Sequence, residues 1–467
     1  MLRLSLTQIA QAMGGTILGS ENPDEVFVDG VSDTDSRLIA PGGIFFAKPG
    51  EFTDGHLFVD AAIANGAALV IVERDVQASV PQIIVPDVVE ALGALAKFVI
   101  AEVRRSGELK IIGITGSNGK TTTKNLVAAL CATLGPTVAP RDSFNNEVGA
   151  PLTMLKVEAN TRYLVLELGA SGIGHIRRLT DLAAPDLGVV LMVGLAHAGE
   201  FGGVEATVTA KSELVSGLVP GSPVILNVDD PRVSSMASLA TGNVLWFGQS
   251  DKAQVRATEI QTSLSGTSFR LHLPDGSSSI VNFKVLGEHH VMNALAMASV
   301  GVELGVELDQ IVRVLEEVVR AERWRMEVMG GSGVTVINDA YNASPDSMAA
   351  GLKTLVQVAG PENRTIAVLG EMSELGEFSG EEHDRIALLV VRLNIDQLVV
   401  VGAGARRLHI SAMNEGSWDG ESRFFDTSDD AYDYLVSFCQ AGDIVLVKSS
   451  NSAGLRFLGD RVAEAFA

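Results

Sequence analysis

The sequence predicts an α/β protein of three domains, in which a central domain with a mostly parallel sheet is flanked by two further α/β domains. Apolar segments of strand length alternate with helix-like segments along the whole chain. The strands expected in the middle are continuous apolar runs, as in parallel sheets that helices cover on both faces. A length of 467 residues suggests about three domains of ordinary size.

The first domain is expected to cover residues 1–107 and to end in a short linker, Ser106-Gly107. A long apolar, helix-like segment at residues 88–104 closes it. Its short apolar strands are expected at residues 26–28, 44–46, 68–72 and 83–85.

The central domain is expected to cover residues 108–322, with a more polar, alternating stretch at residues 255–273 that predicts an antiparallel addition. Its apolar strands are expected at residues 109–112, 163–168, 187–193 and 224–227. The third domain, residues 323–467, alternates strands and helices and predicts a doubly wound, Rossmann-like unit. Its strands are expected at residues 334–337, 366–369, 398–401 and 444–447.

Composition narrows the class of partner and the compartment. The net charge of -22 argues against a nucleic-acid or anionic-membrane partner. The two cysteines lie far apart in the sequence and indicate no disulfide framework, which favours a reducing cytoplasm. The first residues lack the apolar run of a signal peptide, and no apolar run is long enough to cross a bilayer. We expect a soluble, cytoplasmic monomer without membrane insertion.

A glycine-rich segment from Gly113 to Lys124 follows an apolar strand and precedes a helical pattern. In such a turn, backbone N–H groups converge on phosphate oxygens at the positive end of a helix. Lys120 would reach the terminal phosphates, and the Thr121 hydroxyl would bind Mg²⁺. Ile114 stands where a strict Walker A motif has its first glycine, but Gly-Lys-Thr-Thr disfavours an ordinary turn. The segment therefore predicts a P-loop-type nucleotide site.

Polar residues lie in or just after the other central strands, where ligands bind in open α/β sheets. Glu167 lies in an apolar run, and His197 and Asp229-Asp230 follow two further runs. Taken singly, these residues also suit an ion pair, a loop hydrogen bond and a turn. Together with the phosphate loop they predict a cation site that faces the γ-phosphate, with ligands suited to Mg²⁺ or Mn²⁺.

Two further clusters are candidates for nucleotide contacts. Residues 338–345 follow a strand of the third domain, where Asp339 could accept a hydrogen bond from ribose or the segment could be a capped turn. Arg323-Trp324-Arg325 lies at the join of the second and third domains. An arginine there could reach phosphates across an interdomain cleft or make a surface ion pair.

With these motifs the chain resembles the Mur ligases of peptidoglycan synthesis, which use ATP to form amide bonds on UDP-N-acetylmuramoyl peptides. The resemblance extends over essentially the whole chain and is nearest to the branch that adds D-alanyl-D-alanine to UDP-N-acetylmuramoyl-tripeptide. The matching segments are residues 115–122, 143–153, 167–169, 210–213, 289–294, 338–343 and 369–376.

The resemblance implies a role for each domain and for individual residues. The first domain would bind the UDP moiety, the central domain ATP, and the third would close over ATP and help to bind the dipeptide. The substrate-binding residues that it implies are Ser36, Arg37, His56, Asn145 and Asn146. The ATP-binding residues that it implies are Thr115, Gly116, Ser117, Asn118, Gly119, Lys120, Thr121, Thr122, His289, Asn293, Arg325, Asp339 and Asn342.

The resemblance also implies a catalytic group of Lys120, Lys211 and His197 and two Mg²⁺ sites. Thr121 and Glu167 would hold one Mg²⁺, and His197 would help to hold the second. Lys211 matches the lysine that the family carbamylates, so that an anionic side chain can support a metal.

Two features differ from the family pattern or leave a choice. Lys448-Ser449-Ser450 stands where the family often has Lys-Gly-Ser, which affects the expected dipeptide contacts. Arg323 and Arg325 compete for the role at the domain join, and Arg325-Met326-Glu327 matches the family segment better.

Three alternatives stay open at this point. One is a related ligase, which adds another amino acid or resembles folylpolyglutamate synthase. Another is a binding protein that hydrolyses ATP slowly as a switch, which the set of Lys120, Glu167, His197 and Lys211 disfavours. The third, a P-loop kinase, is disfavoured by the large first domain and the lack of an evident lid.

Overall fold

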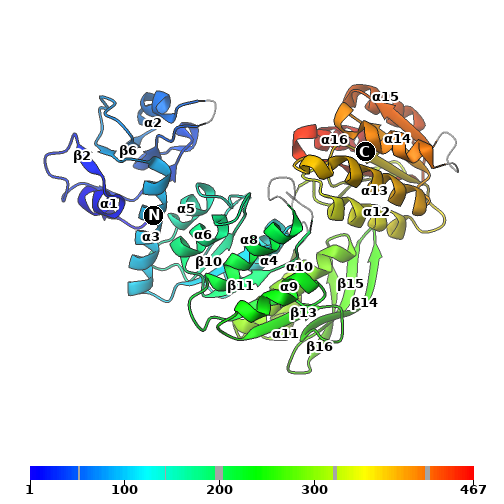
Figure 1. The fold of residues 1–467 in the computed structure, drawn as a ribbon, viewed down its shortest axis with the longest axis horizontal. Coiled ribbons are helices and arrows are strands. Elements are labelled where there is room, and N and C mark those ends of the chain that lie inside the picture. The colour runs from blue at the N-terminus through cyan, green and yellow to red at the C-terminus, as the bar shows by residue number, and fades with distance from the viewer. Residues whose placement is uncertain (51–52, 142, 195–202, 319–322, 416–420) are drawn as a thin grey trace.

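The computed structural model describes residues 1–467 except 51–52, 142, 195–202, 319–322 and 416–420. Three main sheets follow one another along the chain, with the nine-stranded sheet in the middle (Figure 1). This arrangement confirms the predicted fold class. In the described part of the chain, no helix combines the length and apolar character needed to cross a membrane.

The N-terminal sheet has five strands in the order β2-β7-β6-β5-β4. Strands β4 to β7 pair in parallel, and β2 joins β7 antiparallel. The bounds are β2 Thr16–Leu18, β4 Ser32–Asp33, β5 Gly43–Phe46, β6 Ala67–Val72 and β7 Gln82–Ile84. A separate pair joins β1 (Leu4–Ser5) to β3 (Phe27–Val28). The helices are α1 (Leu6–Met13), α2 (Val59–Ala64) and α3 (Val88–Ser106), the last capped by Asp87.

The central sheet has nine strands in the order β16-β15-β14-β13-β12-β11-β8-β10-β9. All neighbours from β9 to β14 are parallel, and β14, β15 and β16 form an antiparallel end. The bounds are β8 Lys110–Thr115, β9 Thr137–Val138, β10 Tyr163–Glu167, β11 Leu187–Val190, β12 Val224–Asn227, β13 Val244–Gly248, β14 Val255–Ser263, β15 Gly266–His272 and β16 Ser278–Phe283.

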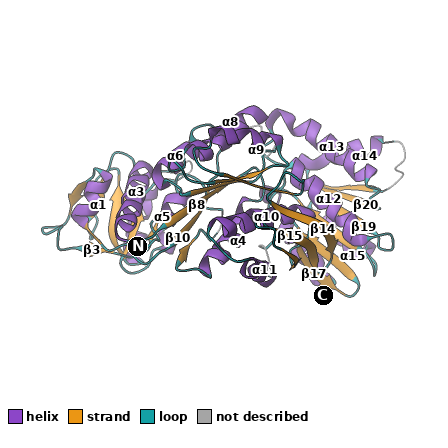
Figure 2. Cartoon of the chain, turned by 90° about the horizontal axis from the view of Figure 1, so that it is seen from below, coloured by secondary structure: helices purple, strands orange, loops and turns teal. Residues whose placement is uncertain are grey.

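Helices cover both faces of this sheet, as Figure 2 shows. One side holds α6 (His175–Ala183), α8 (Val204–Ser216) and α9 (Pro231–Ser235), and the other holds α4 (Lys120–Ala132), α10 (Glu288–Glu303) and α11 (Leu308–Glu317). Strand β10 shows why its sequence is apolar throughout. Leu164 and Leu166 belong to one buried cluster, while Tyr163 and Val165 belong to the other. Successive side chains of a strand point to opposite faces, so two cores require an unbroken apolar run.

The C-terminal sheet has six strands in the order β17-β18-β22-β19-β20-β21 and is parallel except for β17. The bounds are β17 Glu327–Gly331, β18 Val334–Asn338, β19 Thr365–Leu369, β20 Gln397–Val401, β21 Ser422–Phe425 and β22 Ile444–Lys448. The helices are α12 (Pro345–Ala359), α13 (Ser379–Arg392), α14 (Arg406–Asn414), α15 (Ser428–Phe438) and α16 (Leu455–Ala465).

One expected strand is shorter in the structure. The apolar run at 187–193 is a strand only to Val190. Leu191 still donates to the Thr115 carbonyl at 3.0 Å, and the Met192 carbonyl accepts from the Ser117 N–H at 2.8 Å, in the glycine-rich loop. Hydropathy does not detect where the strand ends, because Leu191 and Val193 stay buried beyond it.

Candidate active site

The glycine-rich loop connects β8 to α4 and lies against α10. Gly119 has a φ of +83° and caps α4, a conformation that side chains with a Cβ rarely adopt. A Cβ at Gly119 would lie 2.3 Å from Asn293 Oδ1, on α10. Asn293 Oδ1 also accepts from the Thr123 hydroxyl at 3.2 Å. The expected nucleotide residues Gly119 and Asn293 are therefore neighbours, although they lie far apart in sequence.

Lys120 is the first residue of α4, and its side chain folds over the loop. Its Nζ donates to the Gly116 carbonyl at 2.7 Å and to the Ser117 carbonyl at 3.2 Å. Burial lowers the pKa of Lys120, and the positive charge of Arg325 acts in the same direction, while Glu167 opposes them. The Lys120 ammonium is half-buried and, among the described residues, is held by these two carbonyl oxygens. It is well suited to exchange them for an anion.

Glu167 ends β10 and is only 1% exposed. Its Oε1 accepts from Asn145 Nδ2 at 2.8 Å, whereas its Oε2 is buried without a hydrogen-bond partner among the described residues. A buried carboxylate oxygen left without a partner is costly, unless a cation binds it. Glu167 and Thr121 line one cavity, and the Thr121 hydroxyl lies 3.0 Å from Ser143 Oγ. The two side chains thus offer oxygen ligands of the kind that Mg²⁺ prefers.

Lys211 lies on α8, only 3% exposed. Burial, and next the positive charge of Lys120, hold the pKa of Lys211 well below its usual value. The amine is therefore stabilised in its neutral, nucleophilic form. The other expected metal ligand, His197, lies outside the described residues. Within the part of the chain that the structure describes, no three His, Cys, Asp or Glu side chains gather into a metal site.

A cavity of about 330 Å³ lies between the glycine-rich loop and the C-terminal sheet. From the far side, Asp339 enters it at the end of β18 and is paired with Lys448 at 2.6 Å. Arg325 enters from the domain join, with its guanidinium carbon 4.2 Å from the centre of the Tyr341 ring. The nucleotide residues expected in the cavity wall are Ser117, Asn118, Gly119, Lys120, Thr121, Thr122, His289, Asn293, Arg325, Asp339 and Asn342.

Two expected nucleotide residues, Thr115 and Gly116, support the loop from below. Thr115 is fully buried, and its hydroxyl donates to the Leu168 carbonyl at 2.8 Å. The carbonyl of Gly116 accepts from Lys120, as described above. Asn342 has a similar supporting contact, because its carbonyl accepts from Lys448 Nζ at 3.0 Å.

His289, which also lines this cavity, is held in its neutral form. Burial lowers its pKa to about 4, with Asp339 opposing the shift. Its Nδ1 is buried without a hydrogen-bond partner among the described residues. The neighbouring His290 ring lies 4.2 Å away, centre to centre, and burial also lowers the pKa of His290. Both imidazoles are therefore neutral near pH 7.

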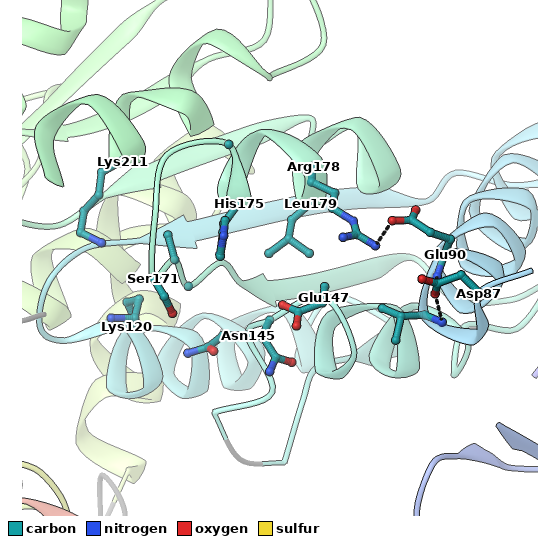
Figure 3. Close-up of a pocket in the computed structure, with 15 residues that line it drawn as sticks. Asp87, Glu90, Lys120, Asn145, Glu147, Ser171, His175, Arg178, Leu179 and Lys211 are labelled. Atoms are coloured by element: carbon teal, nitrogen blue, oxygen red, sulfur yellow. Dashed lines mark hydrogen bonds and ion pairs between the residues drawn. The ribbon is translucent and has the colours of Figure 1, made fainter. Parts of the chain in front are cut away.

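A second cavity, of about 510 Å³, lies between the start of α3 and the central domain. Figure 3 shows Lys120 and Lys211 at one end and Asp87 and Glu90 at the other. Arg178 of α6 bridges to Glu90 at 2.8 Å along this wall. Lys120 and Asn145 line both cavities, so the two spaces meet at these side chains.

The residues expected to bind the acceptor differ in how they are placed. Asn145 and Asn146 both line the second cavity, and Asn146 Oδ1 accepts from the N–H of Gly149 at 2.9 Å, at the start of α5 (Gly149–Met154). Ser36, Arg37 and His56 line neither cavity. Of the residues that the family resemblance implies for the acceptor, the structure places Asn145 beside the loop, but it places none of the three first-domain residues at either cavity.

The three first-domain residues already have protein contacts. Arg37 is exposed and pairs with Asp35 at 2.6 Å, and Ser36 is buried. His56 lies 2.6 Å from Asp54 through Nδ1 and accepts from the Glu73 N–H through Nε2 at 2.9 Å. Both of its ring nitrogens are therefore engaged, and a substrate contact through either would have to displace a protein partner.

The acidic pair after β12 has a structural explanation. Asp229 accepts from the N–H groups of Gln249 and Ser250 at 2.5 and 3.2 Å. Asp230 caps α9 and accepts from the Val193 N–H at 2.8 Å. These contacts support the turn interpretation of Asp229-Asp230 over a role as metal ligands.

Lys448 is a site residue whose signal was present in the sequence but was interpreted only as part of a departure from a family motif. It is the last residue of the apolar strand β22, is 2% exposed and pairs with Asp339. A charged residue at the end of a buried strand is the same signal that identified Glu167. The neighbouring Ser449 is accommodated because Gly370 faces it, where a Cβ would lie 2.7 Å from Ser449 Cβ.

Comparison with known families and proteins agrees with this geometry. Three family models match the chain: the catalytic domain of the Mur ligase family at residues 31–99, the Mur ligase middle domain at residues 114–301, and the glutamate ligase domain of Mur ligases at residues 324–451. The UDP-N-acetylmuramoyl-tripeptide–D-alanyl-D-alanine ligase of Mycobacterium tuberculosis is 42% identical, with 98% of each chain covered. The ligase of the same name from Bacillus subtilis is 31% identical over 97% of each chain.

Solved structures give the same result. MurF from Acinetobacter baumannii superposes with a TM-score of 0.89 and 31% identity, over 99% of each chain. MurF ligase from Thermotoga maritima, solved in complex with ADP, gives a TM-score of 0.80 and 26% identity, over 94% of this chain and 97% of that one. The identity, coverage and fold all lead to one conclusion: this chain belongs to the Mur ligase family.

Proposed function

We propose that this protein uses ATP to join the terminal carboxylate of UDP-N-acetylmuramoyl-tripeptide to the amine of D-alanyl-D-alanine. The similar proteins with 42% and 31% identity carry this activity in their names. One structural observation carries the proposal: two cavities, one on each side of the central domain, meet at Lys120 and Asn145. A reaction that brings a nucleotide and a large acceptor to one lysine fits this geometry.

The chemistry explains why ATP is needed. A carboxylate does not react with an amine at neutral pH, because its oxygen is a poor leaving group. The tripeptide carboxylate attacks the γ-phosphorus, ADP leaves, and an acyl phosphate forms. The amine of the dipeptide then attacks the acyl carbon, loses a proton and expels phosphate. Such phosphoryl transfer needs mainly positioning and charge neutralisation from the protein.

Lys120 supplies that neutralisation in the proposed reaction. Its ammonium would leave the Gly116 and Ser117 carbonyls and bind the γ-phosphoryl oxygens from the loop side. Arg325 would approach the same oxygens from the domain join, since it already lies 3.3 Å from the Thr121 hydroxyl. Residues from two domains then surround the transferred group, and domain closure would keep water from the acyl phosphate.

Mg²⁺ fits the side chains near the loop, and the buried Oε2 of Glu167 is the observation that supports it. Glu167 and Thr121 would hold the ion. When bound, it would reduce the repulsion between carboxylate and triphosphate. A second Mg²⁺ involving His197 and Lys211 remains part of the proposal.

Carbamylation of Lys211 would reverse the sign of this side chain. Its lowered pKa favours the neutral amine, which is the form that adds carbon dioxide. We expect Lys211→Ala to lose most turnover and to recover part of it when a short carboxylic acid such as acetate is added. The rate of ADP release with and without the acid measures this. Equal rates in both conditions would contradict the carbamate.

The first domain would bind the UDP end of the acceptor, and the C-terminal domain the dipeptide, in a monomeric cytoplasmic enzyme. Domain boundaries near residues 107 and 322 belong to the same proposal. A Mycobacterium tuberculosis folylpolyglutamate synthase shares the fold, with a TM-score of 0.58 and 18% identity.

The proposed function is tested by offering the enzyme ATP with a panel of UDP-muramoyl peptides and amines. ADP release should require both the tripeptide acceptor and D-alanyl-D-alanine. Turnover with glutamate and a folate in place of these two would contradict the assignment.

A further inference from the structure

The chain on both sides of Arg325 has an unusual conformation. Trp324 and Met326 have φ values of +61° and +51°, in the left-handed region that residues with a Cβ seldom adopt. Arg325 between them directs its guanidinium toward Thr121, on α4 of the central domain. Strained backbone of this kind persists only where the surrounding contacts hold it in place.

Hydrogen bonds fix the backbone on each side of Arg325. The Trp324 N–H donates to Glu327 Oε2 at 3.0 Å, and its carbonyl accepts from the Tyr341 N–H at 3.1 Å. The Met326 N–H donates to Asp339 Oδ1 at 3.1 Å. The direction of the Arg325 side chain is therefore set by groups at the end of β18, next to the nucleotide cavity.

The Trp324 side chain is held from the opposite side by α16. Its indole Nε1 donates to both carboxylate oxygens of Asp460, at 3.1 Å each. Asp460 also accepts from Arg323 Nη2 at 3.0 Å and from Asn338 Nδ2 at 3.0 Å. The Asp460 carboxylate thus links the last helix to the end of β18 and to the segment between the second and third domains.

An aromatic contact and a glycine bring the partners of this carboxylate together. Trp324 packs edge-on against Phe457, with ring centres 6.0 Å apart. Gly459 faces Asn338, where a Cβ would lie 2.5 Å from Asn338 Nδ2. Asn338 also donates to the Arg456 carbonyl at 2.8 Å. The glycine permits the close approach that places Asn338 against Asp460.

We propose that Asp460, through Trp324, is a positioning residue that holds Arg325 in its place over the nucleotide. Asp460 does not line the nucleotide cavity. It reaches Arg325 through the Trp324 indole, and its second contact, to Asn338, supports the end of β18 on which the same segment rests. The two competing arginines are separated by this arrangement. Arg323 binds Asp460 and is 63% exposed, whereas Arg325 faces the loop. The proposal rests on the proposed function only in that Arg325 acts on bound ATP.

A double-mutant cycle tests this. Asp460→Ala should lower kcat by about 10- to 100-fold, the effect of misplacing a group that contacts the reacting phosphate. Arg325→Ala should lower kcat at least as much. Because Asp460 acts through Arg325, adding Asp460→Ala to Arg325→Ala should change kcat less than about twofold. An equal loss in both backgrounds, or no loss from Asp460→Ala alone, would overturn the proposal.

Two further variants keep the test independent of folding. Trp324→Phe removes the indole donor and keeps an aromatic ring, so it should give the same pattern in the cycle. Asp429→Asn is the matched control, because the Asp429–Arg461 pair also ties α16 to a neighbour but lies on the exposed surface. It should leave kcat unchanged, and a loss equal to that of Asp460→Ala would contradict a specific role.

The same double-mutant cycle can be measured through the Kd of a non-hydrolysable ATP analogue. This measurement separates the positioning role of Asp460 from the proposed function. If the wild-type chain does not join the two substrates, the proposed function fails. Coupling between Asp460 and Arg325 in analogue binding would still support the positioning role of Asp460. Additive effects of Asp460→Ala and Arg325→Ala on that Kd would contradict the positioning role of Asp460, whatever reaction the protein catalyses.

Discussion

At the scale of single residues, the site is defined by titratable side chains that the fold holds away from bulk water before any substrate binds. Lys120 is half-buried and Lys211 is buried, and the pKa values of both are lowered. Glu167 is buried with one oxygen that lacks a partner among the described residues. These states are costly in an empty protein interior and become favourable when an anionic nucleotide and its cation arrive.

Lys120→Ala should therefore remove activity without unfolding the protein. Among the described residues, the side chain donates only to carbonyls of its own loop, so its loss should leave the core intact. We expect kcat to fall by at least about 10²- to 10³-fold, as for the loss of one main stabilising group. ADP release measures the rate, and circular dichroism checks the fold. Near-normal turnover would remove the phosphate role.

His289 predicts a pH dependence of stability. Its pKa is about 4 in the fold, below the usual 6.5, so the unfolded chain binds the proton first as the pH falls. Stability is therefore lost from about pH 6.5 downward and levels off near pH 4, by about 3 kcal/mol at most. Urea unfolding at pH 7 and pH 5.5 should show a larger loss for wild type than for His289→Gln. Equal losses would contradict the burial of a neutral ring.

At the scale of elements, the site forms where strand ends meet a glycine-rich turn. Gly119 allows α4 to begin at Lys120 with the loop close against Asn293. Asp339 and Lys448 end two neighbouring parallel strands, β18 and β22, and meet there as a pair. The geometry of parallel strands thus brings distant residues together at one edge of each sheet.

Gly119→Ala tests the turn itself. The added Cβ meets a φ of +83° and lies 2.3 Å from Asn293 Oδ1, so the loop or α10 must shift. We expect a loss of about 1–3 kcal/mol in stability and a clear rise in KM for ATP. Gly174→Ala is a matched control, because this glycine also has a positive φ but has no heavy atom within 4 Å of the added Cβ. Similar KM values for both variants would argue against the close packing.

Local sequence predicted the elements well where burial alone decides them. The runs at β8, β10, β12 and β22 were recognisable because two cores demand apolar side chains on both faces. Strand β17 (Glu327–Gly331) was missed, because it is an edge strand with two glycines and partly exposed side chains. The predicted end of β11 was too late, because the residues after Val190 are buried but bond to the glycine-rich loop.

Among the site residues too, some could be predicted from local sequence and others could not. The glycine-rich motif indicates the position of Lys120 and the apolar strand that of Glu167, whereas Asn145 was expected only from the family resemblance. Other contacts depend on tertiary structure that local patterns do not contain. One such case is His56, whose two ring nitrogens contact the Asp54 carboxylate and the Glu73 N–H. The anchoring of Trp324 by Asp460, from the other end of the third domain, is another.

At the scale of the whole molecule, three α/β units follow one another (Figure 1). Residues of the first and central units line one cavity, residues of the central and third units line the other, and Lys120 and Asn145 line both. Residues of the third unit reach the central loop through Arg325, and Ser344 donates to Asn118 Oδ1 at 3.1 Å. Chemistry at the meeting point therefore depends on the relative placement of all three units.

The proposed ligase activity is tested most directly by ADP release from ATP by the purified protein. It would be measured with UDP-N-acetylmuramoyl-tripeptide and D-alanyl-D-alanine, added singly and together. We expect rapid release only when both are present, with one amide product formed per ADP. Release at the same rate without the dipeptide, or turnover that needs a different acceptor and amine, would contradict it.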